Sequence, residues 1–169
     1  MIVVDIGCCP HEGDLSVEPL VQRFQPDDLY GFDPLLDANT DYVLAGSRVH
    51  LSRAAAWLRD GQLELAVGAP SPLDATVMRE KNDRHEWQLT TTVPCFDLAE
   101  WLRSLPEPPV VKMNVEGAEF PLLEHLQESG APVARLIVAW HDGRMGGEFT
   151  ARRQRIERGF PCPLEEWTL

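Results

Sequence analysis

The chain has 169 residues, enough for one domain with a single buried core. Hydrophobic residues make up 44% of it and charged residues 25%, which excludes a disordered chain. No apolar run approaches the roughly 20 residues needed to cross a bilayer, so we expect no membrane span. The net charge of −12 disfavours nucleic acid as a partner, because phosphate binding needs clustered Lys and Arg. The local basic cluster ARRQRIER, residues 151–158, has the spacing of a helix with a solvated face.

The amino terminus and the cysteines predict a cytoplasmic protein. The opening MIVVDIG has neither the basic leader nor the small-residue cleavage site of a secretory signal peptide. The four cysteines, Cys8, Cys9, Cys95 and Cys162, form no C-x-x-C pair, so we expect reduced thiols. His11 lies near the first two, but no second ligand pair follows at the spacing of zinc sites, and we predict no metal.

The predicted elements alternate between strands and helices. A short apolar run at 2–6, ending in an acid and Gly7, is typical of a buried parallel strand that enters a loop. The proline-containing stretch 68–83 is predicted to be a surface loop or lid. Apolar periodicity and turn residues predict helices at 14–25, 96–105 and 118–129, and strands at 29–33, 48–53, 62–67, 87–93, 110–115 and 134–140.

This alternation predicts an α/β fold whose doubly wound, mostly parallel sheet has right-handed crossovers. Ligands of such sheets bind beyond the carboxyl ends of the strands. In this chain those ends carry acids, glycines, an asparagine and a histidine, in the segments 5–7, 33–34, 114–117 and 140–142.

Acidic residues end the first two predicted strands, and glycines follow the first one. Gly7 and Gly13 would let a ligand approach the backbone, while the start of the next helix favours an anionic group such as a carboxylate. The dinucleotide pattern G-x-G-x-x-G is absent, which argues against a nicotinamide cofactor. Asp33 can accept hydrogen bonds from both hydroxyls of a ribose. Asp5 or Asp33 alone could equally cap a loop, but together they favour a nucleoside-type ligand.

Several segments, taken in order, resemble the FkbM-type methyltransferases that use S-adenosylmethionine. VVDIGCCPHEG is similar to that family's D-I-G-A-N-x-G motif, and YGFDP to its acidic end of the second strand. RVHLSRAAAWLRDGQLELAV resembles its third strand and Asp-Gly hairpin, and VPCFDLAEWL the segment that follows. VVKMNVEGAEFPLLEHL resembles its most specific signature, K-x-D-V-E-G-A-E before a leucine-rich helix. The resemblance implies a Rossmann-like class I methyltransferase fold.

The resemblance also assigns a cofactor site. It implies that Asp5, Gly7 and Gly13 shape the site for the methionine end of S-adenosylmethionine, and that Asp33 binds its ribose. The turn at 54–56 would lie beside the adenine. In full, the implied cofactor-binding residues are Asp5, Gly7, Cys8, Cys9, Gly13, Asp33, Pro34 and Ala55.

Methyl transfer to oxygen is an in-line displacement that needs an aligned acceptor and a base for the hydroxyl proton. The best base candidates are Glu116 and His141, at the ends of adjacent predicted strands, and His141 would titrate near neutrality if unperturbed. Asn114 is the third catalytic candidate, because it stands where the signature has Asp. The competing interpretations are that Glu116 only caps the next helix and that His141 is an ordinary hydrogen-bonded residue.

We therefore expect a methyltransferase that acts on a hydroxyl of a sugar, polyketide, peptide or lipid-like acceptor. The alternative is a binding or accessory domain that kept the fold and lost turnover. It is motivated by Asn114, by Ala139 where the family has Glu, and by a first loop two residues longer than usual. Because the fold is shortened at both ends relative to the family, we expect an open acceptor side. Either the 68–83 loop or a second subunit in a homodimer would close it.

Overall fold

The computed structural model describes residues 1–8, 16–67, 75–78 and 89–168. Cys9, Gly13 and most of the predicted 68–83 loop lie outside the described residues. The elements, in chain order, are β1 (Ile2–Ile6), α1 (Val17–Phe24), β2 (Asp28–Phe32), β3 (Thr40–Leu44), β4 (Ser47–Ser52), β5 (Ala55–Trp57), β6 (Gly61–Val67), β7 (Leu89–Asp97), α2 (Leu98–Arg103), β8 (Val110–Met113), α3 (Glu119–Ser129), β9 (Arg135–Val138), the 3-10 turn η3 (Asp142–Arg144), α4 (Glu148–Gly159) and β10 (Leu164–Glu166).

The main sheet has seven strands in the order β10-β9-β8-β1-β2-β4-β3. All neighbouring strands pair in parallel except β3 and β4. This confirms an α/β fold with a mostly parallel sheet, compatible with a Rossmann-like arrangement. The sequence did not predict β3, which reaches β4 through the two-residue turn Ala45-Gly46, where both residues have positive φ (49° and 93°).

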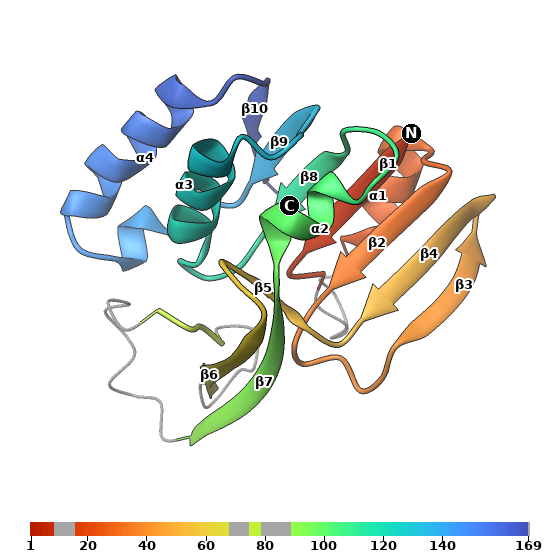
Figure 1. The fold of residues 1–169 in the computed structure, drawn as a ribbon, viewed down its shortest axis with the longest axis horizontal. Coiled ribbons are helices and arrows are strands. Elements are labelled where there is room, and N and C mark those ends of the chain that lie inside the picture. Colours follow the sequence, from red (N-terminus) through yellow and green to blue (C-terminus); the bar gives the residue numbers. More distant parts are fainter. Residues whose placement is uncertain (9–15, 68–74, 79–88, 169) are drawn as a thin grey trace.

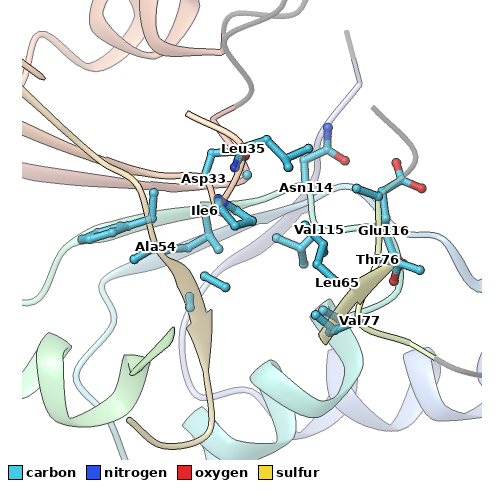
Figure 2. A pocket seen from close by; sticks show the side chains of 17 residues that line it. Ile6, Asp33, Leu35, Ala54, Leu65, Thr76, Val77, Asn114, Val115 and Glu116 are labelled. Carbon is cyan, nitrogen blue, oxygen red and sulfur yellow. Dashed lines mark hydrogen bonds between the residues drawn. The ribbon is translucent and has the colours of Figure 1, made fainter. Parts of the chain in front are cut away.

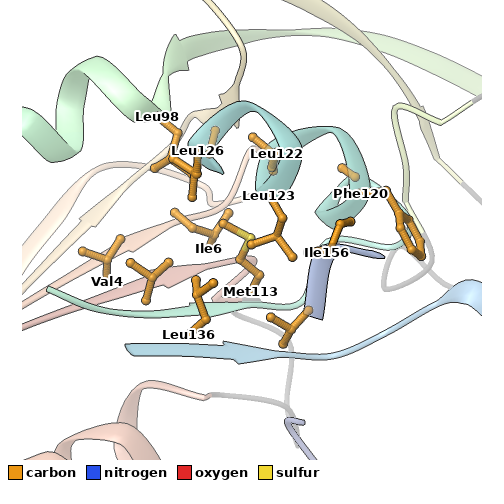
Figure 3. Close-up of a cluster of buried hydrophobic side chains, with 14 of the residues drawn as sticks. Val4, Ile6, Leu98, Met113, Phe120, Leu122, Leu123, Leu126, Leu136 and Ile156 are labelled. Atoms are coloured by element: carbon orange, nitrogen blue, oxygen red, sulfur yellow. The ribbon is translucent and has the colours of Figure 1, made fainter. Parts of the chain in front are cut away.

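Helices cover both faces of this sheet (Figure 1). Alternate side chains of β1 point to opposite faces, as the pleat requires. Val4 and Ile6 enter a core cluster with residues of α2, α3 and α4, and Figure 3 shows leucines of α3 packed over them. Val3 enters a second cluster with residues of α1. Since Asp5 lies on the same side of β1 as Val3, its carboxylate faces α1.

A second sheet of three strands, in the order β5-β7-β6, lies beyond the carboxyl ends of the main sheet (Figure 1). Strand β7 runs to Asp97, four residues beyond the predicted end at 93, because its last residues pair in parallel with β5. Helix α2 consequently begins at Leu98 and not at 96. Asp97 is its N-cap, and the Asp97 carboxylate accepts a hydrogen bond of 3.1 Å from the backbone N–H of Glu100.

The helix predicted for the basic cluster is confirmed as part of α4. The expectation that its basic residues lie on a solvated face is wrong for Arg152 and Arg153, which pack against other side chains. Arg152 forms a two-pronged ion pair with Glu124 of α3, and its guanidinium lies 5.6 Å from the ring centre of Phe120. Arg153 lies over the ring of Trp140, at 5.1 Å. These two arginines therefore contribute to the packing of α4 against α3 and against Trp140, which follows β9. None of the helices in the described ranges is long and apolar enough to cross a bilayer.

Candidate functional site

A pocket of about 140 Å³ lies where the carboxyl ends of β1, β2 and β8 meet the small sheet. In a mostly parallel sheet this is the edge at which ligands bind. Figure 2 shows Asp33 and Ala54 toward one side of the pocket and Asn114, Glu116 and Thr76 toward the other. The full set of described lining residues is Ile6, Gly7, Phe32, Asp33, Pro34, Leu35, Ala54, Ala55, Ala56, Leu65, Ala75, Thr76, Val77, Asn114, Val115, Glu116 and Ala118.

The turn after β1 is packed against the loop after β8. Gly7 has a φ of +77°, and a Cβ added there would lie 1.9 Å from the carbonyl oxygen of Asn114. The backbone N–H of Gly7 donates to the carbonyl of Phe32 at 2.8 Å, and that of Asn114 donates to the carbonyl of Ile6 at 2.9 Å. Only glycine fits this position, both for its backbone angle and for the contact.

Asp33 lies at the pocket wall directly after β2 and is 8% exposed. Its Oδ1 accepts a hydrogen bond of 2.8 Å from the backbone N–H of Leu35, which fixes the direction of the carboxylate. The small side chains of Ala54–Ala56 line the same pocket. A carboxylate beside such an apolar wall can accept hydrogen bonds from the hydroxyl groups of a ligand whose planar ring packs on the alanines.

Asp5 is not among the pocket-lining residues, and its carboxylate is fully buried on the α1 side. It forms an ion pair of 2.8 Å with Lys112 of β8, which is 1% exposed. The Lys112 ammonium also donates to the carbonyl of Gly7 at 2.9 Å and to the hydroxyl of Ser16 at 2.8 Å. The ammonium therefore joins the glycine turn to the start of α1, and among the described residues it is this network that connects the Asp5 carboxylate to the turn.

Cys8 is also absent from the described lining. Its thiol is buried in the α1 cluster, 3.1 Å from the place that a Cβ on Gly31 would take. Burial raises the pKa of the Cys8 thiol, and the nearby carboxylate of Asp5 raises it further, so the thiol stays protonated. Cys8, Cys95 and Cys162 are free cysteines.

Glu116, His141 and Glu119 form a connected charged cluster beside the pocket. Nε2 of His141 lies 3.0 Å from Glu116 Oε1, while Nδ1 of His141 lies 3.2 Å from Glu119 Oε1. Arg144 adds a contact of 3.2 Å to Glu116 Oε2. The structure thus brings the two predicted base candidates into contact, with Glu116 lining the pocket and His141 behind it.

Two carboxylates change the protonation of His141. Burial opposes its charged form, but the hydrogen bonds to Glu116 and Glu119 outweigh burial and raise the pKa of His141 to about 9. At neutral pH the ring is therefore an imidazolium that donates to both carboxylates. A ring in this state has no lone pair with which to take a proton from an acceptor hydroxyl.

Sequence reasoning assigned no role to Lys112, Glu119, Thr76 or Arg144. A lysine inside the apolar run VVKM, and a second acid three residues after Glu116, are both signals of buried partners. Thr76 and Arg144 carry no comparable signal, because their partner Glu116 lies 40 and 28 residues away.

The charge of the pocket narrows the ligands that it can hold. Asp33 and Glu116 contribute carboxylates to the described lining, and no Lys or Arg is part of it. A phosphate-bearing ligand would meet this charge unfavourably, whereas a neutral or cationic ligand would not. Within the described part of the chain, no group of three or more His, Cys, Asp and Glu could hold a metal ion.

The fold and the pocket define an α/β protein with a mostly parallel sheet and a pocket at the carboxyl ends of its strands. No protein-family model matches this chain, and comparisons with curated proteins and with solved structures found no match. Membership of the FkbM family therefore stays a prediction from the sequence motifs.

Proposed function

We propose that this chain is a methyltransferase that uses S-adenosylmethionine and methylates a hydroxyl on a sugar, polyketide, peptide or lipid-like acceptor. The observation that carries the proposal is that the glycine turn after β1 and the carboxylate after β2 line one pocket, beside a charged cluster that contains Glu116. The strand order β4-β2-β1-β8-β9 supports a class I methyltransferase fold. In place of the family's final hairpin, the chain has β10, which pairs in parallel with β9.

The residues present fit the adenosyl part of this cofactor. The Asp33 carboxylate would accept hydrogen bonds from the ribose hydroxyls. The apolar wall formed by Ala54, Ala55 and Ala56 would pack on the adenine. Pro34 stiffens the backbone next to Asp33. The excess of carboxylates in the lining supports a cationic sulfonium over a cofactor with a pyrophosphate.

The methionine part would lie toward Gly7 and Asn114, which contact each other at the far end of β1. Asp5 would act there indirectly, through the Lys112 ammonium that also holds the Gly7 carbonyl. The predicted cofactor contacts of Cys9 and Gly13 fall outside the described residues.

The bound cofactor would supply an activated methyl group, so the protein has to align the acceptor and remove its proton. Glu116 is our candidate for the base, because its carboxylate lines the pocket. His141 is our candidate for a positioning residue, because its imidazolium holds that carboxylate at 3.0 Å. The Asn114 side chain would orient the acceptor or the cofactor between Gly7 and Glu116.

Titration calorimetry with S-adenosylmethionine and S-adenosylhomocysteine tests the proposal. We expect affinity in the micromolar range for the wild-type protein. Asp33→Asn should weaken it about 10- to 100-fold, since hydrogen bonds to a charged group contribute roughly 1.5–3 kcal/mol. The exposed Asp41 provides the matched control, and Asp41→Asn should bind as the wild type does. No heat and no thermal shift at saturating cofactor would refute the proposal.

A second candidate function is a binding or accessory domain without turnover. The observation that favours it is that both oxygens of the Glu116 carboxylate already have cationic partners, His141 and Arg144, which occupy the atoms that a base would use. Radiolabelled methyl transfer to a panel of hydroxyl acceptors separates the two functions. Cofactor binding without transfer to any acceptor supports the accessory domain, and transfer to one acceptor excludes it.

A further inference from the structure

The peptide bond between Glu116 and Gly117 is held at both of its polar atoms by buried side chains. Its carbonyl oxygen accepts a hydrogen bond of 2.7 Å from the Thr76 hydroxyl. Its N–H donates to Glu119 Oε2 at 2.8 Å. Thr76 is 1% exposed and Glu119 is fully buried, so both side chains are held inside the protein, and the bond from Gly117 to Glu119 is buried.

This peptide lies in a conformation that glutamate does not favour. Glu116 has a φ of 53° and Gly117 a φ of 102°. The left-handed region costs a residue with a side chain roughly 1–2 kcal/mol. Such a conformation persists where its surroundings determine it, and the places where proteins keep it are often functional.

Glu119 also links the backbone of this turn to the Glu116 side chain. Its Oε1 accepts from the backbone N–H of His141 at 2.8 Å and lies 3.2 Å from Nδ1 of the same residue. His141 in turn contacts the Glu116 carboxylate. The contacts form a closed ring from the Gly117 N–H through Glu119 and His141 back to Glu116, so the turn and the carboxylate are held together.

Thr76 brings the small sheet into this arrangement. Its backbone pairs with Ala66 of β6 through two hydrogen bonds of 2.9 and 3.0 Å, and its hydroxyl oxygen accepts from the N–H of Met78 at 3.0 Å. The position of its hydroxyl is therefore fixed from both sides. Figure 2 shows Thr76 beside Glu116 at the pocket.

We infer that Thr76 and Glu119 are positioning residues, which hold the 116–117 peptide in its left-handed turn and thereby aim the Glu116 carboxylate at the pocket. The inference rests on the proposed function only in giving the Glu116 carboxylate a catalytic role. The hydrogen bonds that fix the 116–117 peptide are a property of the fold. Through its backbone hydrogen bonds to Ala66, Thr76 also links this turn to β6 of the small sheet.

Thr76→Val tests the inference, because valine keeps the shape of threonine and removes the hydroxyl. Thr76→Ser keeps the hydroxyl, and Thr92→Val is the matched control at an exposed threonine of β7. The main measurement is the titration of His141 by NMR, which reports whether Glu116 stays in contact. In Thr76→Val we expect the pKa of His141 to fall from about 9 part of the way toward 6.5, because the Glu119 bonds remain. In Thr76→Ser, Thr92→Val and the wild type it should stay near 9.

Glu119→Gln should lower the pKa of His141 as well, because it removes one of the two carboxylates. Methyl transfer, measured on the same proteins, should show a lower kcat in Thr76→Val and recovery in Thr76→Ser. An unaltered His141 titration in folded Thr76→Val overturns the inference. If the pKa of His141 falls in Thr76→Val but the protein neither binds S-adenosylmethionine nor transfers a methyl group, the positioning role of Thr76 is established and only the proposed function is refuted.

Discussion

Removal of the Lys112 ammonium tests whether the buried ion pair behind the glycine turn stabilises the fold. Lys112→Met keeps most of the side-chain length and leaves the fully buried Asp5 carboxylate without its cation. Breaking a buried pair by removing one partner costs about 3–5 kcal/mol. For a chain of 169 residues, each kcal/mol lowers Tm by about 2–4 °C, so the expected loss is roughly 6–20 °C.

A double variant distinguishes the cost of a stranded charge from the loss of packing. Asp5→Asn with Lys112→Met removes both charges, and we expect it to recover most of the stability. The pair of the exposed Arg48 with the partly buried Asp28 is the control, and Arg48→Met should cost less than about 1 kcal/mol. The measurements are thermal unfolding, for Tm, and urea unfolding, for the free energy, both followed by circular dichroism. A single variant as stable as the wild type, or a double variant less stable than the single one, would refute this reasoning.

The remaining predictions concern the turn and the histidine. Gly7→Ala should lower the unfolding free energy by more than 2 kcal/mol and abolish ligand binding, because its Cβ would meet the Asn114 carbonyl. Gly46→Ala, with a φ of +93° but open space around it, should lose only about 1 kcal/mol in the same chemical denaturation. The pKa of His141 is raised in the folded state, so its contribution to stability is complete below pH 6.5 and is lost as pH rises through about 9. Between those values the unfolding free energy of the wild type should fall by on the order of 3 kcal/mol relative to His141→Gln, and equal pH profiles for the two proteins would contradict the assignment.

The strands of the main sheet could be predicted where the chain carries a short, mostly apolar run. Such runs predicted core strands at 2–6 and 110–115, and the structure has β1 at 2–6 and β8 at 110–113. Strand β3 was missed although residues 42–44 are apolar: four of its five residues are exposed, and its pairing with β4 depends on the Ala45-Gly46 turn. The junction of β7 and α2 was misplaced because partners on β5, forty residues earlier in the chain, extend the strand.

The candidate site shows the same division between local and distant information. Gly7, Asp33, Asn114 and Glu116 follow strand ends that are visible in the sequence, and the pocket contains all four. Asp5 lies near the carboxyl end of β1, as the sequence indicates, but the pleat of the strand points its side chain toward α1 and away from the pocket. The sequence could not show this, because the side to which β1 presents its odd-numbered residues depends on which helices cover each face.

The sequence by itself determined most of the core strands and helices, the glycine that the first turn needs and the acids near the carboxyl ends of the strands, but not β3, β5 or β10. Each of these depends on neighbouring residues, through apolar periodicity or backbone conformation. Only the tertiary structure decided which polar groups meet. Lys112 joins atoms 96 and 105 residues away, Thr76 reaches Glu116 across 40, and Glu119 accepts from His141 across 22. A buried polar or charged group costs free energy unless it has a hydrogen-bond or ionic partner. Packing in three dimensions, and not proximity in the chain, decides which group that partner is.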